Sequence, residues 1–191
     1  MFCRTIPALL TRKDICEISD DKNPGAFNAF KHFGKGIGSL CLALDMLKGF
    51  LPVFIACMFC ERDSVMLSFV MIAPVLGHAV GMFNRFRGGK CIATTFGVML
   101  GVLPVTAVPL ALLAVLYILF STLIKINPNR LRSIITFTLF AVASAVICGI
   151  LNLFNVAFGC LNIAVIAIVK HVIAKENNST AEEENTKYQE V

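Results

Sequence analysis

The chain has 191 residues, of which 57% are hydrophobic and only 15% are charged, and its formal net charge is +5 at pH 7. A typical soluble domain carries about 25% charged residues, so this composition excludes an ordinary soluble domain. Long apolar runs between residues 40 and 173 indicate a polytopic membrane protein. The basic excess is then best explained by membrane topology, and we expect no nucleic-acid partner.

Charged segments divide the chain into the expected membrane helices. Residues 39–60 and 64–83 are each long enough for one crossing, and residues 91–124 and 133–169 are each long enough for two. Pro104 and Pro109 interrupt the third run, and GILNLFN at 149–155 is the expected turn in the fourth. We therefore expect an all-α bundle of about six transmembrane helices. The single membrane domain would be residues 1–176, followed by a polar, acidic and disordered tail, residues 177–191.

The basic segments set the expected orientation in the membrane. They lie at residues 4–35, 85–90, 125–132 and 170–175, and the expected crossings bring all four to one side. The positive-inside rule makes that side the cytoplasm.

One ionisable pair falls inside an expected span. Asp45 and Lys48 are three residues apart, so they share a helix face and can pair. Charged residues inside a membrane span are functional candidates. The alternative is that both side chains lie near the cytoplasmic end of the helix and reach the lipid headgroups.

The first of three polar clusters on this side occupies residues 19–36. It joins an Asn-Pro-Gly turn to Asn23, Gly25, Asn28 and Lys31, and a helical spacing of Asn28 and Lys31 would present both to an anion. The alternative is a turn followed by a membrane-surface helix whose lysines meet lipid phosphates.

The second cluster is the loop NRFRGGK, which follows His78. Gly88 and Gly89 let a backbone approach an anion closely, and Lys90 heads the next helix, where the helix dipole favours negative charge. A phosphate is the expected guest, with Arg87 beside it. Positive-inside topology would explain the cations but not the glycine pair, and His78 is equally consistent with a packed, hydrogen-bonded histidine.

The third cluster is KHVIAKEN at residues 170–177, which places His171 at the end of the last expected span. The alternative is an ordinary helix terminus whose basic residues complement the dipole. The sequence contains no GxSxG or HExxH motif. Because the CxxC pattern at 57–60 has no second pair and no nearby histidine, we expect no metal and no cofactor.

The first two clusters resemble the bacterial PlsY-type glycerol-3-phosphate acyltransferases, which are integral membrane enzymes built as a bundle of about seven helices. The resemblance covers roughly residues 13–110. Its most specific part is the second motif, which matches at Gly77, His78, Phe86, Arg87, Gly88, Gly89, Lys90, Ala93 and Thr94.

The chain also departs from the family pattern. Asp21, Phe27 and Lys31 stand where the family has serine, threonine and arginine, and the third motif retains only His171. The segment IPALLTRKDI resembles only the cytoplasmic end of the family's first helix, so we expect that helix to be shortened.

The resemblance implies transfer of an acyl group from acyl phosphate to the 1-position of glycerol 3-phosphate. The product would be lysophosphatidate, made for phospholipid biosynthesis at the cytoplasmic face of the bacterial plasma membrane. Lys90 and His78 would be catalytic. The residues that would bind substrate phosphate are Asn23, Gly25, Asn28, Lys31, Arg87, Gly88, Gly89 and His171.

Two other functions remain open from the sequence. The altered motifs are consistent with a catalytically degenerate member that binds a phosphorylated ligand or anionic lipid as a structural membrane protein. A small-solute transporter is less well supported, because the chain has no internal repeat and its polar residues gather on one face of the membrane.

Overall fold

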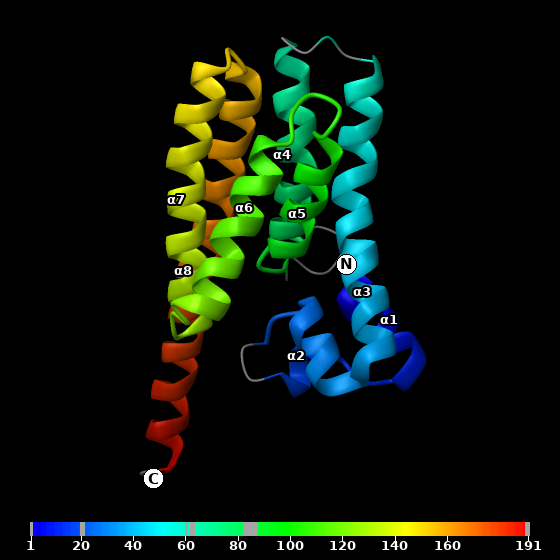
Figure 1. Ribbon diagram of the computed structural model, residues 1–191. Coiled ribbons are helices and arrows are strands. Elements are labelled where there is room, and N and C mark those ends of the chain that lie inside the picture. Colours follow the sequence, from blue (N-terminus) through cyan, green and yellow to red (C-terminus); the bar gives the residue numbers. More distant parts are fainter. Residues whose placement is uncertain (1, 20–21, 60, 62–63, 82–87, 190–191) are drawn as a thin grey trace.

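The computed structural model describes residues 2–19, 22–59, 61, 64–81 and 88–189, with the backbone alone for 174–189. Every regular element in these ranges is helical, which confirms the expected all-α fold (Figure 1). The elements are α1 (Phe2–Thr11), α2 (Ile15–Ile18), α3 (Ala26–Phe59), α4 (Val65–Val80), α5 (Ile92–Gly101), α6 (Val108–Ile118), the π-helix η2 (Leu119–Leu123), α7 (Asn129–Ile150) and α8 (Phe154–Gln189).

Three of these helices are long and apolar enough to cross a membrane. They are α3, α7 and the part of α8 from Phe154 to Ile173, while α4, α5 and the combined α6–η2 are apolar but shorter. Large hydrophobic side chains such as Phe69, Val115 and Val142 lie exposed on the outer helix faces. Because lipid replaces water around such faces, exposed apolar side chains and internally bonded helices are what a membrane protein requires.

The expected breaks between helices are confirmed. A turn at 102–107 separates α5 from α6, and Pro109 lies in the first turn of α6. The last turn falls between Ile150 and Phe154. The start of α3 differs from the expectation, since the helix begins at Ala26 and not near residue 39. Gly34, with φ of 80°, joins a first polar helical segment to the apolar span, a conformation that glycine adopts without steric cost.

The last helix extends into the acidic segment. Its backbone is helical as far as Gln189. Disorder of residues 177–191 in solution therefore stays a prediction that rests on composition alone.

The bundle has two distinct ends. The end of α3, the start of α4 and the α5–α6 and α7–α8 connections lie at one end, whereas α2, the start of α3 and the start of α7 lie at the other (Figure 1). The basic segments 4–35 and 125–132 therefore gather at the same end, as the charge pattern predicts.

The N-terminal helices pack against the first part of α3. Arg4 Nε donates to Asp14 Oδ2 at 2.9 Å, and Asp14 Oδ1 accepts from the Cys16 amide at 3.0 Å. The Arg4 guanidinium holds the pKa of the Asp14 carboxyl below its usual value. Beneath this pair lies a small apolar cluster of Cys3, Ile15, Cys16, Ala29 and Cys41.

Helices α3 and α5 touch through their backbones. A Cβ atom at Gly97 would lie 2.0 Å from the Met46 carbonyl oxygen, and one at Gly49 would lie 2.3 Å from the Thr94 carbonyl oxygen. Small residues at membrane helix interfaces permit such close approach, which strengthens dispersion and backbone contacts. We call this contact the glycine seam.

We expect Gly97→Ala to destabilise the protein by about 1–3 kcal/mol or more, because the added methyl group must displace backbone atoms of α3. Thermal unfolding of the detergent-purified protein measures the effect. Gly149→Ala on α7 is the matched control, since a Cβ there has no neighbour within 4 Å. Equal unfolding temperatures for Gly97→Ala and the wild type would contradict a closely packed seam.

Candidate functional site

A cavity of about 320 Å³ opens where the starts of α3, α5 and α7 meet α4, α6 and α8. None of the described residues that line it is acidic. A cavity with cations and amides but no lining carboxylate favours an anionic guest. The polar lining side chains are Asn23, Asn28, His78, Lys90, Tyr117, Asn129, Arg132, Ser133 and His171.

Two walls enclose this cavity. Helix α3 packs on α5, and this α3–α5 wall carries Asn28 and Lys90. Helix α7 packs on α6 and α8, and this α6–α8 wall carries Arg132 and His171. Helix α4 contacts both α3 and α8 and brings His78 to the cavity between the two walls.

Most of the residues predicted from the sequence meet at this cavity. Lys31 does not, because it is exposed on α3 whereas Asn28 is only 6% exposed. The Asn28 side-chain amide donates to the Asn23 carbonyl at 2.8 Å, which fixes the turn before α3 against the helix. Arg87 lies outside the described residues, as does Asp21. The predicted residues that line the cavity are Asn23, Gly25, Asn28, His78, Lys90 and His171.

The Gly88–Gly89 pair packs against the end of α4. A Cβ atom at Gly88 would lie 1.9 Å from the Ala79 carbonyl oxygen, and the Gly89 amide donates to the His78 carbonyl at 3.2 Å. Neither glycine is among the described lining residues. The structure thus supplies a packing reason for Gly88, and a role of the pair in phosphate binding stays a prediction that rests on the Gly88 amide.

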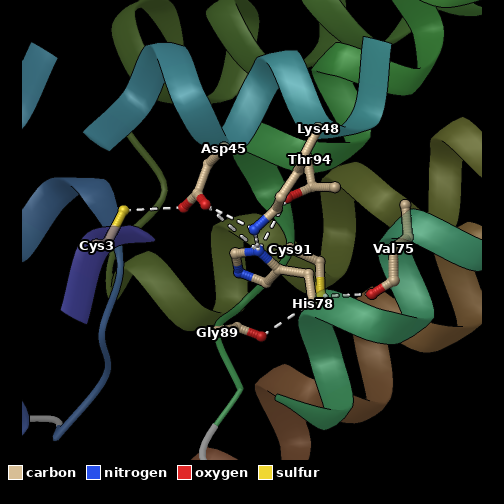
Figure 2. Close-up of polar contacts among 8 residues, drawn as sticks. All are labelled: Cys3, Asp45, Lys48, Val75, His78, Gly89, Cys91 and Thr94. Carbon is tan, nitrogen blue, oxygen red and sulfur yellow. Dashed lines mark hydrogen bonds and ion pairs between the residues drawn. The ribbon is translucent and has the colours of Figure 1, made fainter. Parts of the chain in front are cut away.

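A buried charged cluster contacts the His78 ring (Figure 2). Asp45 is 1% exposed, and its carboxylate accepts from Lys48 Nζ at 2.6 Å and from Cys3 Sγ at 2.9 Å. The predicted Asp45–Lys48 pair is therefore confirmed. Lys48 Nζ also donates to His78 Nδ1, and the Thr94 hydroxyl lies 3.0 Å from the same nitrogen. The pair joins α3 to α4 inside the bundle.

The two histidines present opposite chemistry to the cavity. Because an ammonium group can only donate, Lys48 makes His78 Nδ1 an acceptor, so the neutral ring carries its proton on Nε2. His171 Nδ1 lies 2.7 Å from the Ala167 carbonyl oxygen, which can only accept, so its ring carries the proton on Nδ1. His78 thus offers a donor, and His171 offers the lone pair of Nε2.

A model of the glycerol-3-phosphate acyltransferase family matches residues 1–177. The chain belongs to this family. Among curated relatives, glycerol-3-phosphate acyltransferase 2 of Thermotoga maritima is 43% identical over 98 residues, which are 51% of this chain and 49% of the relative. The enzyme of Legionella pneumophila is 34% identical over 150 residues, 78% of this chain and 51% of the relative. The chain therefore spans about half the length of these relatives.

Solved structures of the family have the same fold. The crystal structure of PlsY, an integral membrane glycerol 3-phosphate acyltransferase, in its glycerol 3-phosphate form has a TM-score of 0.72 and 26% identity. That match covers 94% of this chain and 87% of PlsY. The lysophosphatidic acid form has a TM-score of 0.71 and 29% identity, and the match covers 94% of this chain and 85% of that one.

Sequence reasoning missed the contribution of α7 to this cavity. Asn129, Arg132 and Ser133 line it from the first turns of that helix, and Tyr117 lines it from α6. Positive-inside topology alone accounts for the charge of the basic segment 125–132, so charge does not reveal its place at the cavity. The spacing of Asn129, Arg132 and Ser133 could have indicated a shared polar face, because residues three and four apart on a helix lie on the same side.

We expect Lys48→Met to destabilise the protein by about 3–5 kcal/mol, because the Asp45 carboxylate would stay buried without its cation. The double variant Asp45→Asn/Lys48→Met should recover most of this loss. Thermal unfolding in detergent measures both. Lys35→Met is the control, since Lys35 is an exposed lysine on the same helix. A Lys48→Met protein as stable as the control would contradict a stabilising ion pair.

Proposed function

We propose that this chain transfers an acyl group from acyl phosphate to the 1-position of glycerol 3-phosphate. The product is lysophosphatidate, and the reaction takes place at the cytoplasmic face of the bacterial plasma membrane. The observation that carries the proposal is the cavity itself. It lies at the basic end of a membrane bundle and combines two cations, two histidines and three amides with no acidic lining residue among those described.

The proposed chemistry uses groups that line the cavity. Acyl phosphate is already activated, so the protein must position a glycerol hydroxyl and balance the charge of two phosphates. Alignment of bound reactants can lower such a barrier by roughly 7–11 kcal/mol in favourable cases. Lys90 would stabilise the negative charge that develops on the acyl oxygen and the leaving phosphate. The Nε2–H of His78 would donate a hydrogen bond to the same charge.

The proton of the reaction needs an acceptor. As the glycerol oxygen attacks the acyl carbon, the bond from that carbon to the phosphate oxygen breaks, and phosphate leaves. The hydroxyl proton would pass to the lone pair of His171 Nε2, which has no hydrogen-bond partner among the described residues. General base catalysis of this kind contributes roughly 100- to 10,000-fold.

The direct test is to assay purified protein in liposomes with acyl phosphate and labelled glycerol 3-phosphate. We expect labelled lysophosphatidate from the wild type and a loss of about 100-fold or more for Lys90→Ala, because a preorganised cation is removed. Lys35→Ala, an exposed lysine outside the cavity, should keep wild-type activity. Absence of product from folded wild-type protein would contradict the proposal. Ligand binding without turnover would support the degenerate alternative.

A second prediction concerns His171. His171→Ala should lower kcat by about 100-fold or more, since the proton acceptor is lost. Added imidazole should restore part of the activity, because the substitution leaves space for a small base in its place. His171→Gln should show no rescue, as its side chain occupies that space. If imidazole fails to increase the rate of His171→Ala, His171 is not the proton acceptor.

A further inference from the structure

Arg132 is a cation to which the family resemblance assigns no role. It lies in the first turn of α7, and its side chain lines the cavity. Its Nε atom is buried and has no hydrogen-bond partner among the described residues. Burying a charged donor without an acceptor costs free energy of folding. A ligand that supplies the acceptor for Arg132 Nε would remove this cost.

The guanidinium is held in place by an aromatic ring. Its central carbon lies 5.7 Å from the centroid of the Tyr117 ring, within the range of a cation–π contact. This contact orients the group without using any of its N–H donors. The planar N–H fork therefore stays available for a bidentate partner such as a phosphate.

A second unpartnered group lies on the same wall of the cavity. His171 is 2% exposed, lines the cavity, and leaves its Nε2 atom without a hydrogen-bond partner among the described residues. The start of α7 adds the positive end of a helix dipole and unbonded backbone amides. The α6–α8 wall thus gathers positive charge and unused hydrogen-bonding groups, while Lys90 lines the same cavity from the α3–α5 wall.

Arg130 lies on the same helix as Arg132, but its guanidinium has a hydrogen-bond partner within the protein. Its Nε donates to the His171 carbonyl oxygen at 2.7 Å, so it ties α7 to α8. Arg130 is not among the described residues that line the cavity. Of these two neighbouring arginines, Arg130 ties two helices together, whereas Arg132 lines the cavity and has an Nε atom without a hydrogen-bond partner among the described residues.

We propose that Arg132 binds a phosphate group of a substrate on the α6–α8 wall, as a second anion subsite distinct from that of Lys90. The assignment rests on the proposed acyl transfer, in which two phosphates occupy the cavity at once. The bound group belongs either to glycerol 3-phosphate or to acyl phosphate, which share the phosphate chemistry that Arg132 recognises.

The test combines binding and kinetics on the full chain in detergent or liposomes. Isothermal titration with glycerol 3-phosphate and with inorganic phosphate measures binding without turnover. We expect Arg132→Gln to weaken binding of at least one of these probes, or to raise KM for one substrate, by roughly tenfold or more. A rise in KM for glycerol 3-phosphate places the acceptor phosphate at Arg132, and a rise for acyl phosphate places the donor phosphate there.

Further variants separate phosphate binding from general charge or folding. Lys125→Gln is the matched control, because it removes one positive charge from an exposed position just before α7. Tyr117→Leu should produce a smaller loss of binding than Arg132→Gln, and Tyr117→Phe should retain binding because the ring remains. Arg132→Lys should recover only part of the affinity, since lysine lacks the planar fork. Unfolding temperatures confirm that each variant is folded.

The outcomes distinguish this inference from the function on which it rests. If the wild type binds glycerol 3-phosphate or phosphate but forms no product, and Arg132→Gln loses that binding, the subsite stands and acyl transfer fails. If Arg132→Gln keeps wild-type binding and both KM values, the inference is overturned. It is also overturned if folded wild-type protein binds neither probe and forms no product.

Discussion

The ion pair between Asp45 and Lys48 is the contact on which the arrangement of the site depends. A carboxylate that is 1% exposed inside a membrane bundle must keep its partners, so this pair fixes where α3 meets its neighbours. Through Lys48 it reaches His78 on α4, and through Cys3 it reaches α1. One desolvated charge thus links three helices and, through Lys48, sets which nitrogen of the His78 ring carries the proton.

Much of the architecture follows from local sequence features. Proline breaks and apolar run lengths locate the ends of α5 and α6, and a spacing of three residues predicts the Asp45–Lys48 pair correctly. These features succeed because helix period and backbone chemistry act within a few residues of the chain. The motif residues on α3, α4, α5 and α8 also converge on one cavity, although no local rule required them to meet.

Other features depend on contacts that local patterns do not encode. The link between Lys48 and His78 joins residues far apart in the chain, and it decides the tautomer of the ring. The sequence predicts that the Gly88–Gly89 pair binds an anion, whereas the close contacts of the pair in the structure are with the end of α4. Arg132 and Arg130 are nearly adjacent in sequence, yet only the direction of each side chain around α7 separates a cavity residue from a packing residue.

The glycine seam has a consequence for how this cavity can change over evolutionary time. Positions 49 and 97 admit no side chain without moving a backbone, so the α3–α5 wall is nearly fixed in shape. The α6–α8 wall is built from side chains such as Tyr117 and Arg132, which can be exchanged one at a time. New substrate preferences should therefore arise by substitution on the α6–α8 wall, while the α3–α5 wall keeps its shape.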